Sequence, residues 1–156
     1  MSGYHISDPH LIRQLLTTLL GKEVSTADSE PVSFSSAAAV GVYRDEQGKA
    51  HAACACDLHF AAYASAALTM IPVDAAQDTI QTGTLTDDER ANLHELMNVC
   101  VGFFNRGNVA RIRLAELCDH DALPEDVTAL YDGPHKADIL AEIDGYGAGR
   151  LSLRCG

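Results

Sequence analysis

The pattern of apolar and polar positions is clearest in one segment just past the middle of the chain, where it has the period of an α-helix. At about 100° per residue, the apolar side chains form one broad stripe. The stripe consists of Leu93, Leu96, Met97, Cys100, Val101, Phe103 and Phe104. Glu95, Asn98 and Gly102 cluster opposite it. This arrangement predicts a helix that packs on a core and turns Glu95 and Asn98 to solvent.

Both ends of this helix are marked in the sequence. Thr86, followed three residues later by Glu89, has the pattern of a capping box. The run Asn105-Arg106-Gly107-Asn108 contains residues that tolerate the left-handed conformation typical of a helix end. We therefore expect one continuous helix from residue 87 to residue 104.

The rest of the chain alternates between helical and strand-like patterns. Asp8-Pro9 and Gly21 are typical of the two ends of a helix. The segment between residues 21 and 32 and the one between residues 71 and 85 are polar and are expected to be connections. The further expected elements are helices 9–20 and 58–70, strands 32–43, 50–56, 109–117, 136–143 and 150–155, a hairpin turn at 44–48, a glycine-rich turn at 145–149, and a polar loop 119–134 holding one helical turn.

This order of elements predicts the fold class. It runs helix, two strands, helix, helix and three strands, which is typical of an α/β (α+β) protein. We expect a mostly antiparallel sheet packed against two or three helices. With 156 residues, of which 47% are hydrophobic, and no break in composition, residues 1–156 are predicted to form a single domain.

Charge excludes one large class of partners. The chain has 22 acidic and 11 basic residues, and its most basic stretch is Arg106, Arg111 and Arg113. Binding to a phosphate backbone needs clustered Lys and Arg, so no nucleic acid partner is expected. Arg111 and Arg113 are interpreted as the solvent side of a strand, with a protein interface as the alternative. The sequence has no membrane-spanning run and no signal-peptide pattern, so a cytoplasmic location with no membrane partner is expected.

The five cysteines do not indicate a disulfide framework, because their number is odd and no secretory signal is present. A strand through Cys54 and Cys56 would point two thiols the same way, with His59 nearby. A thiol or metal module is one hypothesis for them, but no second ligand pair completes a set of four. Buried small hydrophobes are the favoured interpretation, so no metal site is predicted.

Other catalytic patterns do not occur in the sequence. It has no nucleophile elbow, no phosphate-binding loop and no His-Glu-x-x-His motif. Glu95 and Asn98, one turn apart on one helix surface, are therefore the main candidates for chemistry.

Glu95-Leu96-Met97-Asn98, with Gly102 following, resembles the Glu-x-x-Asn-x-x-x-Gly helix of the CheC/CheX/FliY phosphatases, which act on chemotaxis response regulators. The order of the elements is also similar to that of the CheX-like members. Because the expected helix 58–70 has no Glu-x-x-Asn, the single-site CheX-like arrangement is the better comparison. Two positions differ from the family pattern: Ala91 replaces a common Asp or Ser, and His94 replaces a common glycine.

The resemblance implies a phosphatase acting on the aspartyl phosphate of a receiver domain. Asn98 would position the water, and Glu95 would dock the partner through its active-site lysine. Gly102 would allow close approach, and His94 would lie at the edge of the partner-binding surface. The chain itself would bind no cofactor, because the required Mg²⁺ is expected in the phosphorylated receiver domain.

The alternative is a catalytically inactive CheX-like domain for binding or dimerisation in a two-component signalling pathway. CheX-like proteins pair through their sheets, so a homodimer is expected. The strand ending at Cys155 is the predicted exposed edge.

Overall fold

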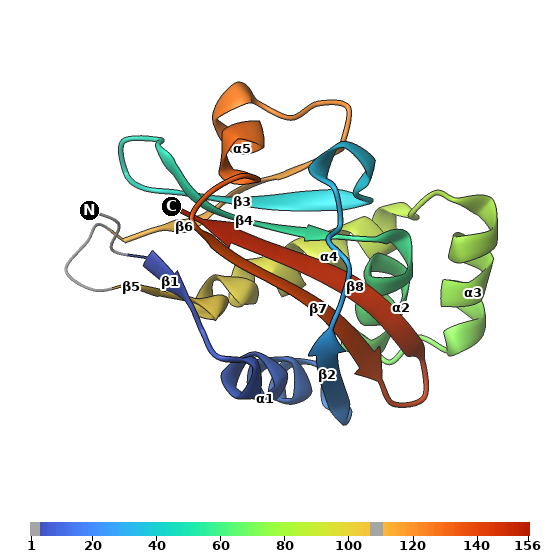
Figure 1. Cartoon of the computed structure of the whole chain (residues 1–156). Coiled ribbons are helices and arrows are strands. Elements are labelled where there is room, and N and C mark those ends of the chain that lie inside the picture. Colours follow the sequence, from blue (N-terminus) through green and yellow to red (C-terminus); the bar gives the residue numbers. More distant parts are fainter. Residues whose placement is uncertain (1–3, 107–110) are drawn as a thin grey trace.

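A six-stranded antiparallel sheet forms the centre of the computed structural model, which describes residues 4–106 and 111–156. The strand order is β2-β7-β8-β4-β3-β6, and a separate two-stranded sheet pairs β1 with β5 (Figure 1). The strands are β1 (Tyr4–Ile6), β2 (Val24–Asp28), β3 (Ala39–Arg44), β4 (Ala50–Cys56), β5 (Phe104–Arg106), β6 (Arg113–Cys118), β7 (His135–Ile143) and β8 (Gly147–Cys155).

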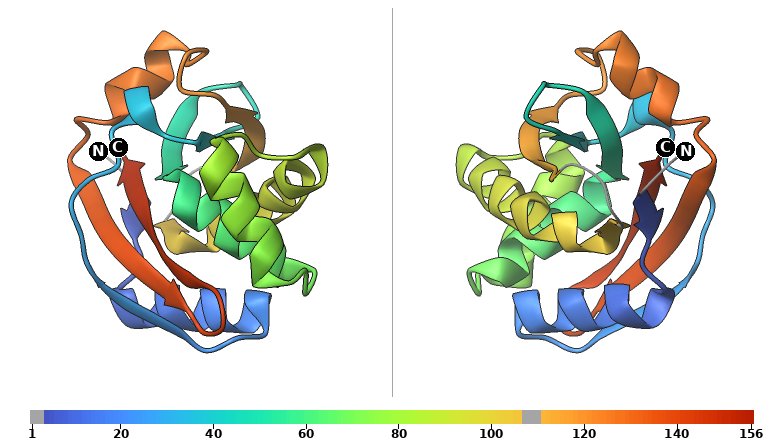
Figure 2. Two further views of the ribbon diagram at one scale, coloured as in Figure 1. Left: turned by 90° about the vertical axis from the view of Figure 1, so that its right-hand side faces the viewer. Right: turned by 90° about the vertical axis from the view of Figure 1, so that its left-hand side faces the viewer.

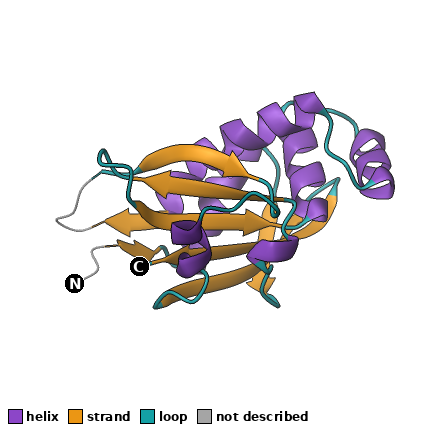
Figure 3. Cartoon of the chain, turned by 90° about the horizontal axis from the view of Figure 1, so that it is seen from above, coloured by secondary structure: helices purple, strands orange, loops and turns teal. Residues whose placement is uncertain are grey.

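Helices cover both faces of the large sheet. The α-helices are α1 (Pro9–Leu20), α2 (Leu58–Leu68), α3 (Val73–Thr82), α4 (Asp87–Val99) and α5 (Glu125–Leu130), and the 3-10 turns are η1 (Phe34–Ser36) and η2 (Cys100–Phe103). Buried residues of α1, α2 and α4 share one core cluster with the sheet, whereas η1 and α5 contribute to the cluster on the opposite face (Figure 2). The strands form one layer, and α2, α3 and α4 are grouped beside it (Figure 3).

The central strand β4 is buried on both faces, which explains its alanine-rich composition. In β4, Ala52, Cys54 and Cys56 belong to the helix-side cluster. Ala53 and Ala55 belong to the cluster on the other face. Small side chains on both sides let the covering elements come close to the backbone. The strand prediction for 50–56 is therefore confirmed, despite the weak β propensity of alanine.

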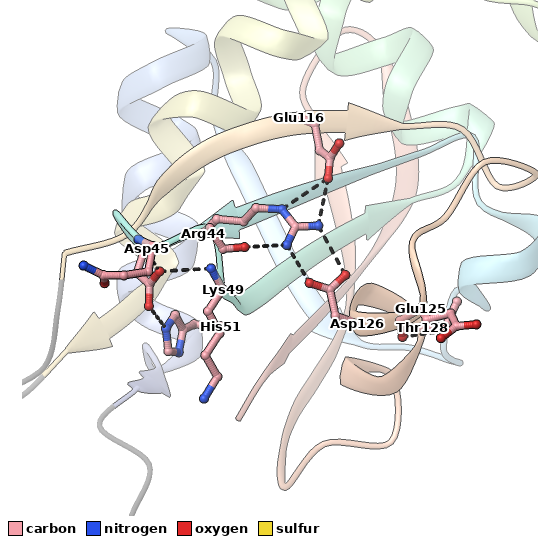
Figure 4. Close-up of polar contacts among 10 residues, drawn as sticks. Arg44, Asp45, Lys49, His51, Glu116, Glu125, Asp126 and Thr128 are labelled. Atoms are coloured by element: carbon pink, nitrogen blue, oxygen red, sulfur yellow. Dashed lines mark hydrogen bonds and ion pairs between the residues drawn. The ribbon is translucent and has the colours of Figure 1, made fainter.

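Several predicted elements are confirmed in place. Helix α1 begins after Asp8, whose Oδ1 accepts a hydrogen bond from Leu11 N at 3.0 Å, and it ends at Gly21 in the left-handed conformation with φ 65°. In the predicted hairpin turn, Asp45 Oδ1 accepts hydrogen bonds from the backbone N–H groups of Gln47 and Lys49 (Figure 4). The predicted helical turn in the 119–134 loop is α5.

Two expected connections are in fact regular elements. The polar segment after α1 contains β2, an edge strand in which only Val24 is buried. The segment 71–85 contains α3, which packs on α2 through the small buried residue Ala76, while the buried Thr79 faces Glu89 of α4. Neither segment carries a large apolar stripe, because each buries only a few small side chains.

Three boundaries differ from the predictions. Residues 32–38 are not strand, because Val32 and Phe34 pack on the outer face of the sheet and Val32 N bonds to Ser152 Oγ at 2.7 Å. Strand β6 begins at Arg113, and residues 109 and 110 of the predicted strand 109–117 lie outside the described residues. The helix predicted for 87–104 ends at Val99 and continues as η2 and β5.

The predicted free edge at Cys155 is wrong. Strand β8 lies between β7 and β4, and Cys155 pairs with both His135 and Ala52. The edges of the large sheet are β2 and β6. Within the part of the chain that the structure describes, no helix is long and apolar enough to cross a membrane.

The start of α4 is fixed by a buried carboxylate that the capping box brings to α3. Glu89 is 5% exposed, and its Oε1 accepts a hydrogen bond from Thr86 N at 2.9 Å. Thr79 Oγ1 of α3 lies 2.6 and 2.7 Å from the two carboxylate oxygens of Glu89. Glu89 therefore stabilises the first turn of α4 and also links α4 to α3.

Replacing Glu89 by Ala should lower the free energy of unfolding by about 1–3 kcal/mol, because the Thr86 N–H and the Thr79 hydroxyl lose their acceptor. Asp88→Ala is the matched control, since it removes an exposed carboxylate from the same turn and should cost roughly 0.5 kcal/mol. Urea unfolding followed by circular dichroism measures both. Equal effects of the two substitutions would contradict the role given to Glu89.

Candidate functional site

Helix α4 displays the predicted polar residues on a face backed by the core. Leu93, Leu96 and Met97 are fully buried. Glu95 and Asn98 are exposed, as the helical period predicts. The side chains are therefore available to a partner, and the backbone that carries them is held by packing.

The last turn of α4 is attached to the sheet directly behind Asn98. The buried Tyr43 hydroxyl of β3 donates a hydrogen bond to the Met97 carbonyl oxygen at 2.6 Å. Beside it, Gly41 permits close packing, because a Cβ built there would lie 3.4 Å from Met97 Cβ and Cγ. Burial raises the pKa of Tyr43 well above its ordinary value, so its hydroxyl stays protonated and able to donate.

Gly102 lies in the 3-10 turn η2 rather than in the α-helix. The turn brings the chain back toward α1, where the Ser7 hydroxyl donates to the Gly102 carbonyl oxygen at 3.4 Å. The following strand β5 pairs with β1, with Phe104 opposite Ile6. Gly102 is exposed, so the predicted access to its surface is retained although its local conformation differs from the prediction.

An open groove of about 720 Å³ lies beside Asn98. Its lining residues are Asn98, Val101, Gly102, Phe104, Arg111, Ile112 and Arg113. The groove brings together two of the four predicted site residues, Asn98 and Gly102. Glu95 does not line it and lies one turn earlier on the exposed face of α4.

His94 lines a separate hollow of about 380 Å³. The other residues of this hollow are Asp87, Arg90 and Ala91 of α4 and Leu117 of β6. His94 thus lies toward the edge strand, at the border of the exposed surface of α4. A partner seated on Glu95 and Asn98 would meet it only if the contact extended toward β6.

Arg111 and Arg113 are exposed, as predicted for the solvent side of a strand, although Arg111 precedes β6. The sequence did not indicate that both line the groove with Asn98. The alternation of basic and apolar residues in Arg111-Ile112-Arg113 is the feature of the sequence that could have indicated this surface. Ile112 is 5% exposed, and its two neighbours are both exposed.

The cysteines lie inside the protein. Cys54 and Cys56 both point to the helix-side core, as the strand period predicts, and they are fully buried. Burial raises the pKa of both thiols well above the ordinary value. Across residues 4–106 and 111–156, no group of three or more His, Cys, Asp or Glu side chains is arranged to hold a metal ion. Their complete burial is consistent with a packing role for these two thiols.

Replacing Tyr43 by Phe should lower the free energy of unfolding by about 1–2 kcal/mol, because the buried Met97 carbonyl loses its donor. Tyr63→Phe is a suitable control, because the Tyr63 hydroxyl has no hydrogen-bond partner among the described residues. Chemical denaturation measures both variants. A neutral result for Tyr43→Phe would show that the bond does not fix the end of α4.

The buried thiols should react slowly with an aromatic disulfide reagent at pH 8, and all five should react after unfolding in urea. The pKa of Cys155 is raised from 9.0 to about 11, so the folded state favours its protonated thiol. The contribution of this protonated thiol to the free energy of unfolding is complete below pH 9 and is lost as the pH rises toward 11. The free energy of unfolding should therefore fall between pH 9 and pH 11. Rapid reaction of more than three of the five thiols in the folded protein would contradict burial of Cys54 and Cys56.

The fold is similar to that of two proteins of known structure. The FliM middle domain from Vibrio alginolyticus superposes with a TM-score of 0.53 at 10% sequence identity, covering 94% of this chain and 88% of that one. Thermotoga maritima FliY superposes with a TM-score of 0.51 at 14% identity, covering 92% of this chain and 81% of that one.

Comparison of the sequence itself gives no such match. No protein-family model matches this chain, and no curated protein matches it. The likeness at 10% and 14% identity therefore concerns the fold. It confirms the predicted α/β class with a mostly antiparallel sheet, and the likeness to the FliY fold covers 92% of this chain.

Proposed function

We propose that the protein is a phosphatase acting on the aspartyl phosphate of a response-regulator receiver domain. The observation that carries the proposal is the exposed carboxamide of Asn98, held beside an open groove on a helix whose opposite face is buried. The Glu95–Asn98 motif and the FliY-like fold support the same assignment. A cytoplasmic location follows from such a partner.

The chemistry needs little from this chain. An aspartyl phosphate is an activated acyl phosphate, and the partner's own Mg²⁺ neutralises charge on the phosphoryl group. The Asn98 carboxamide oxygen accepts a hydrogen bond from a water molecule and aligns it with the phosphorus. The water oxygen bonds to phosphorus as the bond to the aspartate oxygen breaks. Inorganic phosphate takes up the protons that the water loses, and the aspartate leaves as a carboxylate.

Glu95 has a different role in the proposal. It lies outside the groove but one turn from Asn98, where its carboxylate pairs with the active-site lysine of the receiver domain. That ion pair sets the register of the partner along α4. His94, at the border of the same surface, contacts the partner without taking part in the chemistry.

The fold does not require glycine at position 102, so we attribute this glycine to close docking of the partner. A Cβ built at Gly102 would meet Leu15 Cδ2 at 3.6 Å, which is an ordinary contact distance. Alanine would therefore fit the folded protein. The use of glycine is better explained by a partner that comes close to this turn.

Phosphatase activity is tested by mixing the protein with phosphorylated receiver domains and Mg²⁺ and following release of phosphate. Asn98→Ala should lower kcat about 100-fold, because the water loses its positioning group. Glu95→Ala should raise KM roughly tenfold, equivalent to about 1.4 kcal/mol of lost binding. Gln81→Ala and Asp88→Ala remove an exposed carboxamide and an exposed carboxylate elsewhere, and both should match wild type.

Folding of each variant is checked by thermal unfolding. Full activity of Asn98→Ala, or no acceleration of phosphate loss from any receiver domain of the same genome, would refute the proposed reaction.

A second candidate is a partner-binding or dimerisation domain without catalysis. It is favoured by the two sheet edges, β2 and β6, whose outer sides pair with no other described strand. A homodimer formed by edge-to-edge pairing would appear in light scattering as twice the monomer mass. Binding of a receiver domain without release of phosphate would favour this candidate over the enzyme.

A further inference from the structure

The groove beside Asn98 is positively charged in a protein that is otherwise acidic. The chain carries a formal net charge of −11. Among the residues that the structure describes, the lining of the groove nevertheless includes two arginines and no acidic residue. A negatively charged partner would be repelled by much of the surface and attracted here.

Arg111 and Arg113 differ from the arginines that serve the fold. Arg44 forms ion pairs with Glu116 at 3.0 Å and Asp126 at 2.6 Å (Figure 4). Arg90 and Arg154 likewise pair with acidic side chains. Arg111 and Arg113 are exposed, and no carboxylate among the described residues pairs with either.

Arg111 and Arg113 flank a buried residue, so both guanidinium groups lie on the groove side of the segment. Ile112 between them is 5% exposed and anchors the segment, so its neighbours on both sides are turned outward. Both line the groove with Asn98. Two adjacent guanidinium groups offer ten N–H donors in fork geometry, which suits carboxylates and phosphoryl oxygens.

We infer that Arg111 and Arg113 dock the acidic rim around the aspartyl phosphate of a receiver domain. The inference rests on the proposed function and adds to it the residues that capture the partner. Mg²⁺ is held by carboxylates, so an aspartyl phosphate with its own metal is surrounded by acidic groups. The arginines bind carboxylates of that rim and bring the phosphoryl group to Asn98.

Docking of this kind acts on association more than on the chemical step. Long-range attraction between opposite charges raises the association rate, and salt screens it over about 8–10 Å. The arginines are positioning residues, so their loss should change kcat/KM and its dependence on salt while leaving kcat in place.

The test compares Arg111→Ser/Arg113→Ser with Arg150→Ser/Arg13→Ser, a double control with the same loss of charge. Arg13 and Arg150 do not line the groove. Two quantities are measured for a phosphorylated receiver domain between 25 and 300 mM salt: kcat and KM for phosphate release. Affinity is measured separately by fluorescence anisotropy with the same domain held in the phosphorylated form by beryllofluoride.

Docking through the groove predicts that Arg111→Ser/Arg113→Ser lowers kcat/KM and affinity roughly tenfold at low salt, with kcat within about twofold of wild type. The effect should shrink at high salt, and the control pair should show a clearly smaller loss. Equal losses in the two double variants would overturn the inference, because only net charge would then matter. A fall in kcat with unchanged affinity would also overturn it, because the arginines would act on the phosphoryl group instead.

The same measurements separate this inference from the proposed function. If Asn98→Ala abolishes phosphate release and the arginine variants behave like the control, the enzyme stands and the docking site is wrong. If wild type releases no phosphate but binds the beryllofluoride form through Arg111 and Arg113, the docking site stands and the enzyme is wrong. If wild type binds no receiver domain, both are wrong.

Discussion

The close approach of two helices to the central strands determines where the candidate site lies. Helix α2 meets β8 at Gly149, where a Cβ would lie 2.2 Å from Phe60 N. Any residue with a Cβ would clash there, so this position requires glycine. Helix α4 meets β3 at Gly41, where a Cβ would touch Met97. Alanines of α2 let that helix lie close to the sheet backbone, whereas α4 packs through Leu93, Leu96 and Met97. Close packing in the interior leaves both helices little freedom to shift.

Positioning a carboxamide requires that both ends of its helix be fixed. The first turn of α4 is attached to α3 through Glu89, and the last turn to β3 through the Tyr43 hydroxyl. Beyond the helix, η2 and β5 connect this turn to β1 by strand pairing. Asn98 therefore projects from a backbone held on three sides, while its own side chain remains exposed. A group that must orient a water within a fraction of an ångström benefits from such support.

The sequence predicted those parts of the fold in which large apolar residues repeat with a clear period. The inner face of α4 and the ends of α1 follow directly from this pattern. Strand β2 and helix α3 were missed because each buries few and small side chains, Val24 in one and Ala76 with Thr79 in the other. Strand order is a long-range property that no local pattern encodes, which is why β8 was wrongly expected at an edge. The exposure of Asn98 was predictable because it follows from the local helical period. The groove that Asn98 shares with Arg111 was not predictable, because it depends on how distant segments pack.

The shifted pKa values in the described residues mark structural contacts rather than the candidate site. The hydrogen bond from His51 lowers the pKa of Asp45, and the hydrogen bond from Arg44 lowers that of Asp126. Burial accounts for the raised pKa values of the thiols and of Tyr43. None of these groups lines the groove beside Asn98.

A carboxamide does not titrate near neutral pH, and hydrolysis of an activated acyl phosphate needs a placed water more than a proton acceptor. The proposed reaction therefore requires a well-placed carboxamide from this chain, while the partner supplies the metal and the reactive bond. In this proposal, α4 contributes the Asn98 carboxamide and the Glu95 carboxylate, which depend on its packing against the sheet, and the segment that begins β6 contributes the positive charge of Arg111 and Arg113.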